Sequence, residues 1–201
     1  MDKKIAIFGD SISYGVWDTV GGGWFSRLRK YYEMKSQEHQ FYNFSICGYT
    51  SDDLVKVVKF ETSLKKLDIA FVAIGINDAG FIENKNKPWV SQKRFEKNIQ
   101  KIHQILKVNV KKIIFVGLTK VNEKKTDPIV YSRLHFYYND RIKQYNDLIN
   151  EYCIINKLDF IDVYSEFKIK YINNDGLHPN SLGQKYIFEK VKLYLLKNKI
   201  L

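Results

Sequence analysis

The feature that most constrains the fold of this chain is a regular alternation of short apolar runs with amphipathic stretches. Apolar runs occur at residues 5–8, 41–46, 69–74, 112–118 and 160–163. Continuous runs of this kind predict strands that are buried on both faces of a sheet. Apolar residues on one face predict helices over residues 95–106, over 142–152 and after residue 179. Helices are also expected over 24–34, after a turn of three glycines, and from residue 51, where Ser51-Asp52-Asp53 form an acidic capping turn. The alternation predicts an α/β fold, with a parallel sheet that carries helices on both faces.

Length and composition narrow the classes of protein that this chain can belong to. It has 201 residues, the size of one domain, so we expect residues 1–201 to form a single domain. With 45% hydrophobic and 15% aromatic residues, it is not a disordered chain. Its net charge of +11 comes from lysines scattered along the whole sequence. That scatter favours a solvated basic surface without nucleic acid as a partner, and a patch that attracts an anionic partner or substrate is the alternative.

Cysteine content and the N-terminus indicate the cellular setting. Two cysteines, Cys47 and Cys153, cannot form a disulfide-rich scaffold or a cysteine zinc cluster, so we expect two reduced thiols. The first apolar run is shorter than the apolar core of a secretory signal, which has about 7–15 residues. Nor does any run approach the ~18 apolar residues of a membrane span. We therefore expect a cytoplasmic protein without a membrane span.

Residues that can do chemistry follow several of the predicted strands. In an open parallel sheet, ligands bind beyond the carboxyl ends of the strands, so these positions are expected to meet at one edge. Ser11 follows the first strand, Gly48 the second and Asn77 the third. A serine in a tight turn can present its hydroxyl, a glycine leaves its N–H open to a ligand, and an amide donates a hydrogen bond without a titratable proton. Taken singly, each also fits a commoner role: a phosphate-binding or capping turn, a turn glycine and an Asx turn.

A histidine close to the C-terminus adds a base to this set. His178 lies in a loop, and Asp175 comes three residues earlier, so one tight turn can hold the two side chains together. The carboxylate would orient the ring and stabilise the imidazolium. His39, in a polar turn, His103, on a helix, and His135, in a long connection, are weaker candidates. A nucleophile, a base, an orienting acid and two oxyanion donors form a constellation for acyl transfer to water.

Four sequence blocks give the chain a specific resemblance to a known family. The blocks are Gly9-Asp10-Ser11, Gly48, Gly75-Ile76-Asn77-Asp78 and Asp175-Gly176-Leu177-His178-Pro179. Their order and spacing resemble those of the SGNH hydrolases, also called the GDSL esterase/lipase family, over nearly the whole chain. The sequence departs from the family pattern at two points. Ile12 stands where the family name has Leu, and the second block lacks the inner glycine that often precedes its key glycine.

The resemblance implies both a fold and a set of roles. The implied fold is a flavodoxin-like three-layer α/β/α sandwich with strand order 2-1-3-4-5. Ser11 would be the nucleophile, His178 the general base and Asp175 the residue that orients His178. The backbone N–H groups of Ser11 and Gly48 would form an oxyanion hole with the Asn77 side chain. No metal and no cofactor are expected.

The resemblance leaves the substrate open within the class of small-molecule esters. We expect a short acyl group, such as acetyl, on a carbohydrate or another small polar alcohol, and lysophospholipase or thioesterase activity is the alternative. Asp10, Trp17 and Trp24 are candidate substrate contacts. Residues 119–139 are either a lid or a surface insertion.

The alternative from another functional class is a non-catalytic flavodoxin-like module that binds nucleotides or anions, in which Ser11 caps a phosphate loop. The oligomeric state is not indicated.

Overall fold

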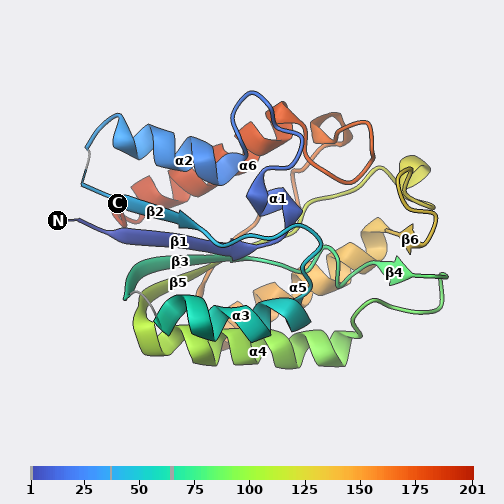
Figure 1. Ribbon diagram of the computed structural model, residues 1–201, viewed down its shortest axis with the longest axis horizontal. Helices are drawn as coiled ribbons and strands as arrows, with labels where there is room; N and C mark the ends of the chain where they lie inside the picture. The colour runs from blue at the N-terminus through green and yellow to red at the C-terminus, as the bar shows by residue number, and fades with distance from the viewer. Residues whose placement is uncertain (1, 37, 64–65) are drawn as a thin grey trace.

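A central parallel sheet organises the protein, whose computed structural model describes residues 2–36, 38–63 and 66–201 (Figure 1). Within these residues the sheet has five strands, β1 (Lys4–Gly9), β2 (Gln40–Asn43), β3 (Leu67–Ala73), β5 (Val110–Val116) and β7 (Asp159–Ile161). Their order is β2-β1-β3-β5-β7, and every neighbouring pair is parallel. If the five strands of this sheet are numbered 1 to 5 along the chain, their order is 2-1-3-4-5, so the predicted topology is confirmed.

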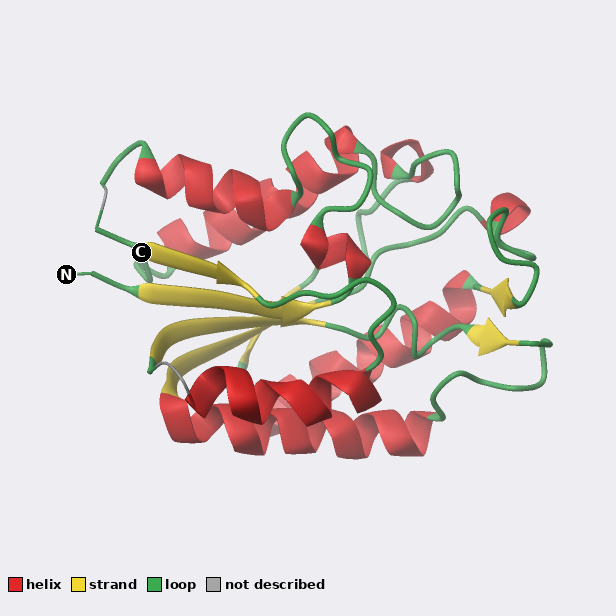
Figure 2. Cartoon of the chain, in the orientation of Figure 1, coloured by secondary structure: helices red, strands yellow, loops and turns green. Residues whose placement is uncertain are grey.

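Helices cover both faces of the sheet and give the three layers seen in Figure 2. Helices α2 (Trp24–Glu33) and α6 (Ser181–Lys197) lie on one face, and α3 (Ser51–Ser63), α4 (Gln92–Asn109) and α5 (Asn139–Asn156) lie on the other. The apolar spacing in the sequence explains this packing. In α4, for example, Phe95, Ile99, Ile102 and Leu106 are all buried against the core, as their spacing predicts.

The sheet is the centre of the hydrophobic core because its middle strands are apolar on both faces. Ile5, Ala6, Ile7 and Phe8 of β1 are fully buried, and β3 and β5 carry similar apolar runs. Burial on both faces is the usual state of a parallel strand covered by helices. The sheet therefore forms a rigid base on which the loops at its carboxyl edge are held.

The second strand is shorter than its apolar run predicts, and the difference affects the loop that follows. The Asn43 side chain accepts a hydrogen bond from the Ser45 N–H at 3.0 Å, which bends the backbone and ends the strand. The chain still follows β1, because the Ile46 N–H donates to the Gly9 carbonyl oxygen at 3.1 Å. This contact places the following residues, including Gly48, at the carboxyl edge of the sheet.

Irregular segments surround that carboxyl edge, toward which the arrowheads in Figure 1 point. The short helix α1 (Ser11–Tyr14) follows β1 directly. Strand β4 (Phe81–Ile82) pairs antiparallel with β6 (His135–Phe136), which ties the loop after β3 to residues 119–139. The small β4–β6 sheet was not expected from the sequence, because two-residue strands leave no periodic signal.

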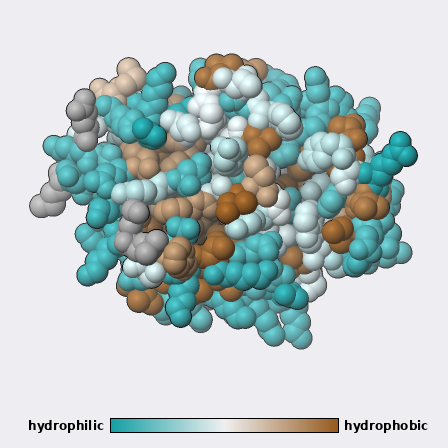
Figure 3. Space-filling view, viewed as in Figure 1, coloured by the Kyte–Doolittle hydropathy of each residue, from teal (hydrophilic) through white to brown (hydrophobic). Residues whose placement is uncertain are grey.

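The outer surface is mainly polar on the face drawn in Figure 3, where apolar residues form small separate groups. Such scattered apolar residues are normal for a folded surface. Among the residues that the structure describes, no helix combines the length and the apolar character needed to cross a membrane.

Candidate active site

The turn after β1 presents Ser11 at the carboxyl edge of the sheet. Gly9 ends the strand where the backbone passes so close to β3 that a Cβ there would lie 2.6 Å from the Ala73 carbonyl oxygen. Asp10 then caps α1, because its carboxylate accepts the Ile12 N–H at 2.9 Å. Ser11 is therefore the first residue of α1, and only 6% of its surface is exposed.

A tight loop before α6 holds Asp175 and His178 together. One carboxylate oxygen of Asp175 accepts the backbone N–H groups of Leu177 and His178, both at 3.0 Å. The other lies 2.5 Å from Nδ1 of the His178 ring. Because an ionised carboxylate can only accept, Nδ1 carries the proton and Nε2 is free to accept one.

The Asp175 carboxyl is held in its ionised form. Burial alone would raise its pKa, but the hydrogen bond and the charge of His178, together with the backbone N–H donors of Leu177 and His178, hold that pKa below its ordinary value. Asp175 therefore stays a carboxylate at neutral pH and keeps fixing the tautomer of His178.

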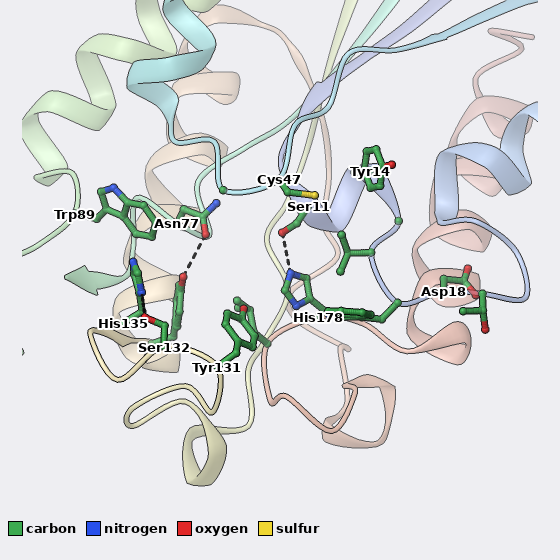
Figure 4. A pocket seen from close by; sticks show the side chains of 17 residues that line it. Ser11, Tyr14, Asp18, Cys47, Asn77, Trp89, Tyr131, Ser132, His135 and His178 are labelled. Atoms are coloured by element: carbon green, nitrogen blue, oxygen red, sulfur yellow. Dashed lines mark hydrogen bonds between the residues drawn. The ribbon is translucent and has the colours of Figure 1, made fainter. Parts of the chain in front are cut away.

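The hydroxyl of Ser11 completes a chain of hydrogen bonds with this pair. Its Oγ lies 2.8 Å from Nε2 of His178, the ring atom that is free to accept a proton (Figure 4). The contact joins residues that lie 167 positions apart in the sequence. An arrangement of carboxylate, imidazole and hydroxyl can remove a proton from the hydroxyl and so convert it into a nucleophile.

Two more of the expected residues, Gly48 and Asn77, line the same cavity as Ser11 and His178. Gly48 has a φ of 80°, a conformation that residues with a side chain rarely adopt. A Cβ there would meet no atom within 4 Å, so the backbone geometry, rather than crowding, calls for glycine. The Asn77 amide Nδ2 donates to the Tyr49 carbonyl oxygen at 2.8 Å, which joins the Gly48 loop to the turn after β3.

The cavity has a volume of about 830 Å³, and most of its wall is apolar. Its aromatic side chains come from three separate segments and include Tyr14, Trp17, Trp89, Tyr131 and Tyr137. Figure 4 shows Trp89, Tyr131, Ser132 and His135 on the side of the cavity away from Tyr14. The mainly apolar wall can accept an apolar group beside Ser11.

The three candidate substrate contacts lie in different places. Trp17 lines the cavity and is 62% exposed at its rim. Trp24 instead lies in the core at 1% exposure, with edge contacts to Phe25 and Phe71 at 5.8 Å between ring centroids. Its position at the first turn of α2 directs it toward the sheet. Asp10 is likewise buried, as a helix cap, and neither Trp24 nor Asp10 lines the cavity.

Part of the cavity wall was not identified from the sequence. Residues 119–139 contribute Tyr131, Ser132, His135 and Tyr137, and the loop after β4 contributes Trp89. The ring centroids of Trp89 and His135 lie 4.7 Å apart, and Ser132 Oγ lies 2.5 Å from Nδ1 of His135. Of this wall, the sequence had singled out only residues 119–139, as either a lid or a surface insertion.

A buried carboxyl beside Asn77 was also missed as a site residue. Asp78 is fully buried and accepts the backbone N–H of Ser51 at 3.0 Å and the Ser51 hydroxyl. Burial raises the pKa of Asp78 to about 7, against the opposing effect of the Ser51 hydrogen bonds. Because Ser51 begins α3, Asp78 ties the start of that helix to the turn that carries Asn77.

The remaining candidates are less suited to chemistry. Cys47 lines the cavity beside Ser11, but burial and the nearby charge of Asp10 raise the pKa of its thiol, which disfavours the thiolate. Cys153 is buried in the core. His103 bonds to the Tyr152 hydroxyl at 2.8 Å, away from the cavity. Within the described ranges, no group of three His, Cys, Asp or Glu side chains could hold a metal ion.

Solved structures with the same fold include several hydrolases. A lipase/acylhydrolase from Enterococcus faecalis aligns with a TM-score of 0.76 and 23% identity, covering 96% of this chain and 95% of that one. An alpha/beta hydrolase enzyme from the metagenome of Lake Arreo, Spain, aligns with a TM-score of 0.74 and 19% identity, covering 95% and 94%. An acetyl xylan esterase from Geobacillus stearothermophilus aligns with a TM-score of 0.72 and 18% identity, covering 94% and 92%.

Sequence comparison gives the family directly. No curated protein matches the chain. The GDSL-like lipase/acylhydrolase family matches it over residues 7–186, nearly the whole length and all four sequence blocks. Given the hydrogen-bonded serine, histidine and carboxylate at the carboxyl edge of a three-layer α/β/α fold, this match decides the assignment. The chain belongs to the GDSL-like lipase/acylhydrolase family and is a carboxylic ester hydrolase.

Proposed function

We propose that this protein hydrolyses carboxylic esters through an acyl-enzyme formed on Ser11. The observation that carries the proposal is the continuous hydrogen-bond chain from Asp175 through His178 to Ser11, with contacts of 2.5 and 2.8 Å. The chain of contacts ends at a cavity large enough for an ester, so the hydroxyl and the substrate carbonyl can meet.

In the proposed first half-reaction, Ser11 Oγ attacks the ester carbonyl carbon while its proton passes to Nε2 of His178. The carbonyl oxygen becomes an oxyanion, which accepts hydrogen bonds from the Ser11 and Gly48 N–H groups and from the Asn77 amide. Loss of a single donor of this kind costs about 10²–10³ in kcat. The C–O bond to the alcohol then breaks, and the alcohol leaves with the proton from His178.

In the second half-reaction, water replaces the alcohol. His178 takes a proton from the water, whose oxygen attacks the acyl carbon, and the bond between that carbon and Ser11 Oγ breaks as Ser11 regains its proton. The carboxylic acid is released and the resting enzyme is restored. Asp175 stays ionised throughout and stabilises the imidazolium that forms twice in each cycle.

For the substrate, we propose a short acyl ester, such as an acetyl ester, of a carbohydrate or another small polar alcohol. Trp17 at the rim and Trp89 in the wall offer aromatic faces of the kind on which a sugar ring packs. The fold-level neighbour described as an acetyl xylan esterase is compatible with this choice.

A second candidate follows from the cavity itself. Its volume of about 830 Å³ and mainly apolar wall exceed what an acetyl group needs. An ester with a longer acyl chain, as in a lysophospholipid, or a thioester would use more of that wall. Activity against acyl chains of increasing length separates the two candidates, since a cavity that binds only acetyl gains nothing from added methylene groups.

The experiment that tests the proposed reaction compares two serine variants on a panel of nitrophenyl esters from acetyl to decanoyl and on acetylated sugars. Ser11→Ala is expected to lower kcat by about 10⁶-fold. Ser13→Ala is the matched control, because Ser13 lies on the same short helix and its buried hydroxyl has no hydrogen-bond partner in the described structure. It should keep wild-type kcat. More than a few per cent of wild-type activity in Ser11→Ala would exclude the acyl-enzyme on Ser11. A wild-type protein that hydrolyses none of these esters would favour the non-catalytic binding module.

A further inference from the structure

The side-chain amide of Asn77 is held at both of its ends. Its Nδ2 donates one hydrogen to the Tyr49 carbonyl oxygen at 2.8 Å. Its Oδ1 faces the hydroxyl of Tyr137, which donates to it at 3.3 Å, as the dashed line at Asn77 in Figure 4 marks. The second hydrogen on Nδ2 is therefore left for a ligand in the cavity.

The contact with Tyr49 selects one of the two flipped orientations of the amide, and the Tyr137 hydroxyl supports that orientation by donating to Oδ1. The Tyr49 carbonyl oxygen can only accept, so it requires the NH₂ group on its side. If the amide were flipped, Oδ1 would face that oxygen and NH₂ would face the Tyr137 hydroxyl. A flipped amide would also offer an acceptor to a developing oxyanion, which would repel it.

Tyr137 is itself held firmly enough to act as a fixed donor. Its backbone N–H donates to the Thr126 carbonyl oxygen at 3.0 Å, and its carbonyl oxygen accepts the Thr126 hydroxyl at 2.8 Å. The ring packs over Gly80, where a Cβ would lie 2.9 Å from Cε1 of the ring. Burial raises the pKa of the Tyr137 phenol, so the hydroxyl keeps its proton at neutral pH and can donate to Asn77.

We propose that Tyr137 is a positioning residue for the oxyanion hole: by donating to Oδ1, its hydroxyl holds the Asn77 amide in the orientation that the Tyr49 carbonyl oxygen selects. The inference rests on the proposed function, in which Asn77 donates to the oxyanion. The hydrogen bond to Oδ1 also polarises the amide and makes the remaining Nδ2 hydrogen a better donor. Residues 119–139 thus supply a functional group as well as a wall.

A double-mutant cycle tests this role, with Tyr137→Phe measured in the wild type and in Asn77→Ala. Titration with a serine-reactive phosphonate gives the concentration of active sites, so that kcat refers to folded enzyme only. In the wild type, Tyr137→Phe should lower kcat by about 3- to 10-fold, the effect of one net hydrogen bond, with KM nearly unchanged. In Asn77→Ala the same substitution should have almost no effect, because the amide it positions is gone.

Tyr164→Phe is the matched control. Its hydroxyl donates to the Asn139 carbonyl oxygen at 2.9 Å, so it also holds the end of this segment, but it lies outside the cavity. It should leave kcat unchanged. Equal losses from Tyr137→Phe in both backgrounds would overturn the positioning role, since Tyr137 would then act independently of Asn77. If Asn77→Ala itself left kcat unchanged, the oxyanion assignment in the proposed function would fail as well, so the two failures are distinguishable.

Discussion

At the scale of single residues, the site depends on which atoms carry protons. Asp175 stays ionised because its hydrogen-bond donors outweigh the cost of its burial. That carboxylate places the proton of the imidazole on Nδ1 and leaves Nε2 of His178 to accept from Ser11. In the proposed reaction, the direction of proton transfer is therefore set before substrate binds.

Replacing Asp175 by Asn should move the proton of the His178 ring from Nδ1 to Nε2 and so block proton transfer from Ser11. The amide can still accept the two backbone N–H groups through its oxygen, but it then points NH₂ at Nδ1 of His178. Nδ1 would have to accept, and Nε2 would carry the proton and could no longer take one from Ser11. By analogy with the same change in a serine protease triad, we expect a loss of about 10⁴ in kcat without loss of fold.

Steady-state kinetics and circular dichroism measure the two parts of this prediction. Asp162→Asn is the matched control, because Asp162 accepts the Ser165 N–H in a similar turn outside the cavity. It should keep wild-type kcat. An Asp175→Asn variant with kcat within tenfold of the wild type would contradict the assigned tautomer.

At the scale of secondary-structure elements, the sequence predicted the parts that follow a simple period. The five strands of the sheet and the helices α2 to α6 were predicted because burial of a whole face leaves apolar residues at regular spacing. Ser11, Gly48 and Asn77 were expected to meet because parallel strands bring their carboxyl ends to one edge, and His178 was added because Asp175 lies three residues before it; all four line one cavity.

The remaining parts lack such a period. The wall formed by Trp89, Tyr131 and His135 comes from irregular loops, in which contacts depend on tertiary packing. Trp24 was expected near the cavity because it ends the loop that starts at Tyr14, but the helix that begins at Trp24 turns its side chain into the core. Burial of Asp78 depends on how α3 packs against the turn after β3, which no local pattern reveals.

The Asp78 contact at the start of α3 predicts a pH-dependent contribution to stability. Burial raises the pKa of Asp78 from its ordinary value of about 4 to about 7 in the folded protein, so folding favours the protonated form. The contribution of Asp78 to the free energy of unfolding is fully present below pH ~4 and is lost as the pH rises through about 7. Asp78→Asn cannot ionise and does not undergo this loss.

Urea unfolding of the two proteins between pH 5 and 8.5 measures this effect. The free energy of unfolding of Asp78→Asn minus that of the wild type should grow with pH, by at most about 1.4 kcal/mol per pH unit, and level off above the pKa of Asp78. Other titrating groups are common to both proteins and cancel in the difference. A difference that stays constant over this range would contradict the raised pKa.

At the scale of the whole molecule, the net charge of +11 is the feature that the catalytic site does not explain. Many surface lysines pair with neighbouring carboxylates, as Lys111 does with Asp68 and Lys143 with Asp147. Exposed pairs of this kind contribute little to stability and are screened by salt. The charge can still act at long range on the approach of an anionic ester.

Salt dependence separates a solvating charge from a steering one. For a neutral short ester, kcat/KM should change less than about twofold between 0.05 and 0.5 M salt, because there is no substrate charge to screen. For an ester with an anionic alcohol, a fall in kcat/KM over the same range is expected if the surface steers substrate.

We expect weak binding of duplex DNA at physiological salt, and tight binding with a steep salt dependence would contradict the interpretation of the charge as a solvated surface.

The central claim is that one hydroxyl, that of Ser11, is activated by His178 and becomes acylated. Labelling with a serine-reactive phosphonate, followed by intact-mass and peptide mass spectrometry, tests it most directly. We predict one adduct per chain, on the peptide that contains Ser11, with no adduct in Ser11→Ala and almost none in His178→Ala. A wild-type protein that stays unlabelled, or a label on any other residue, would contradict the account.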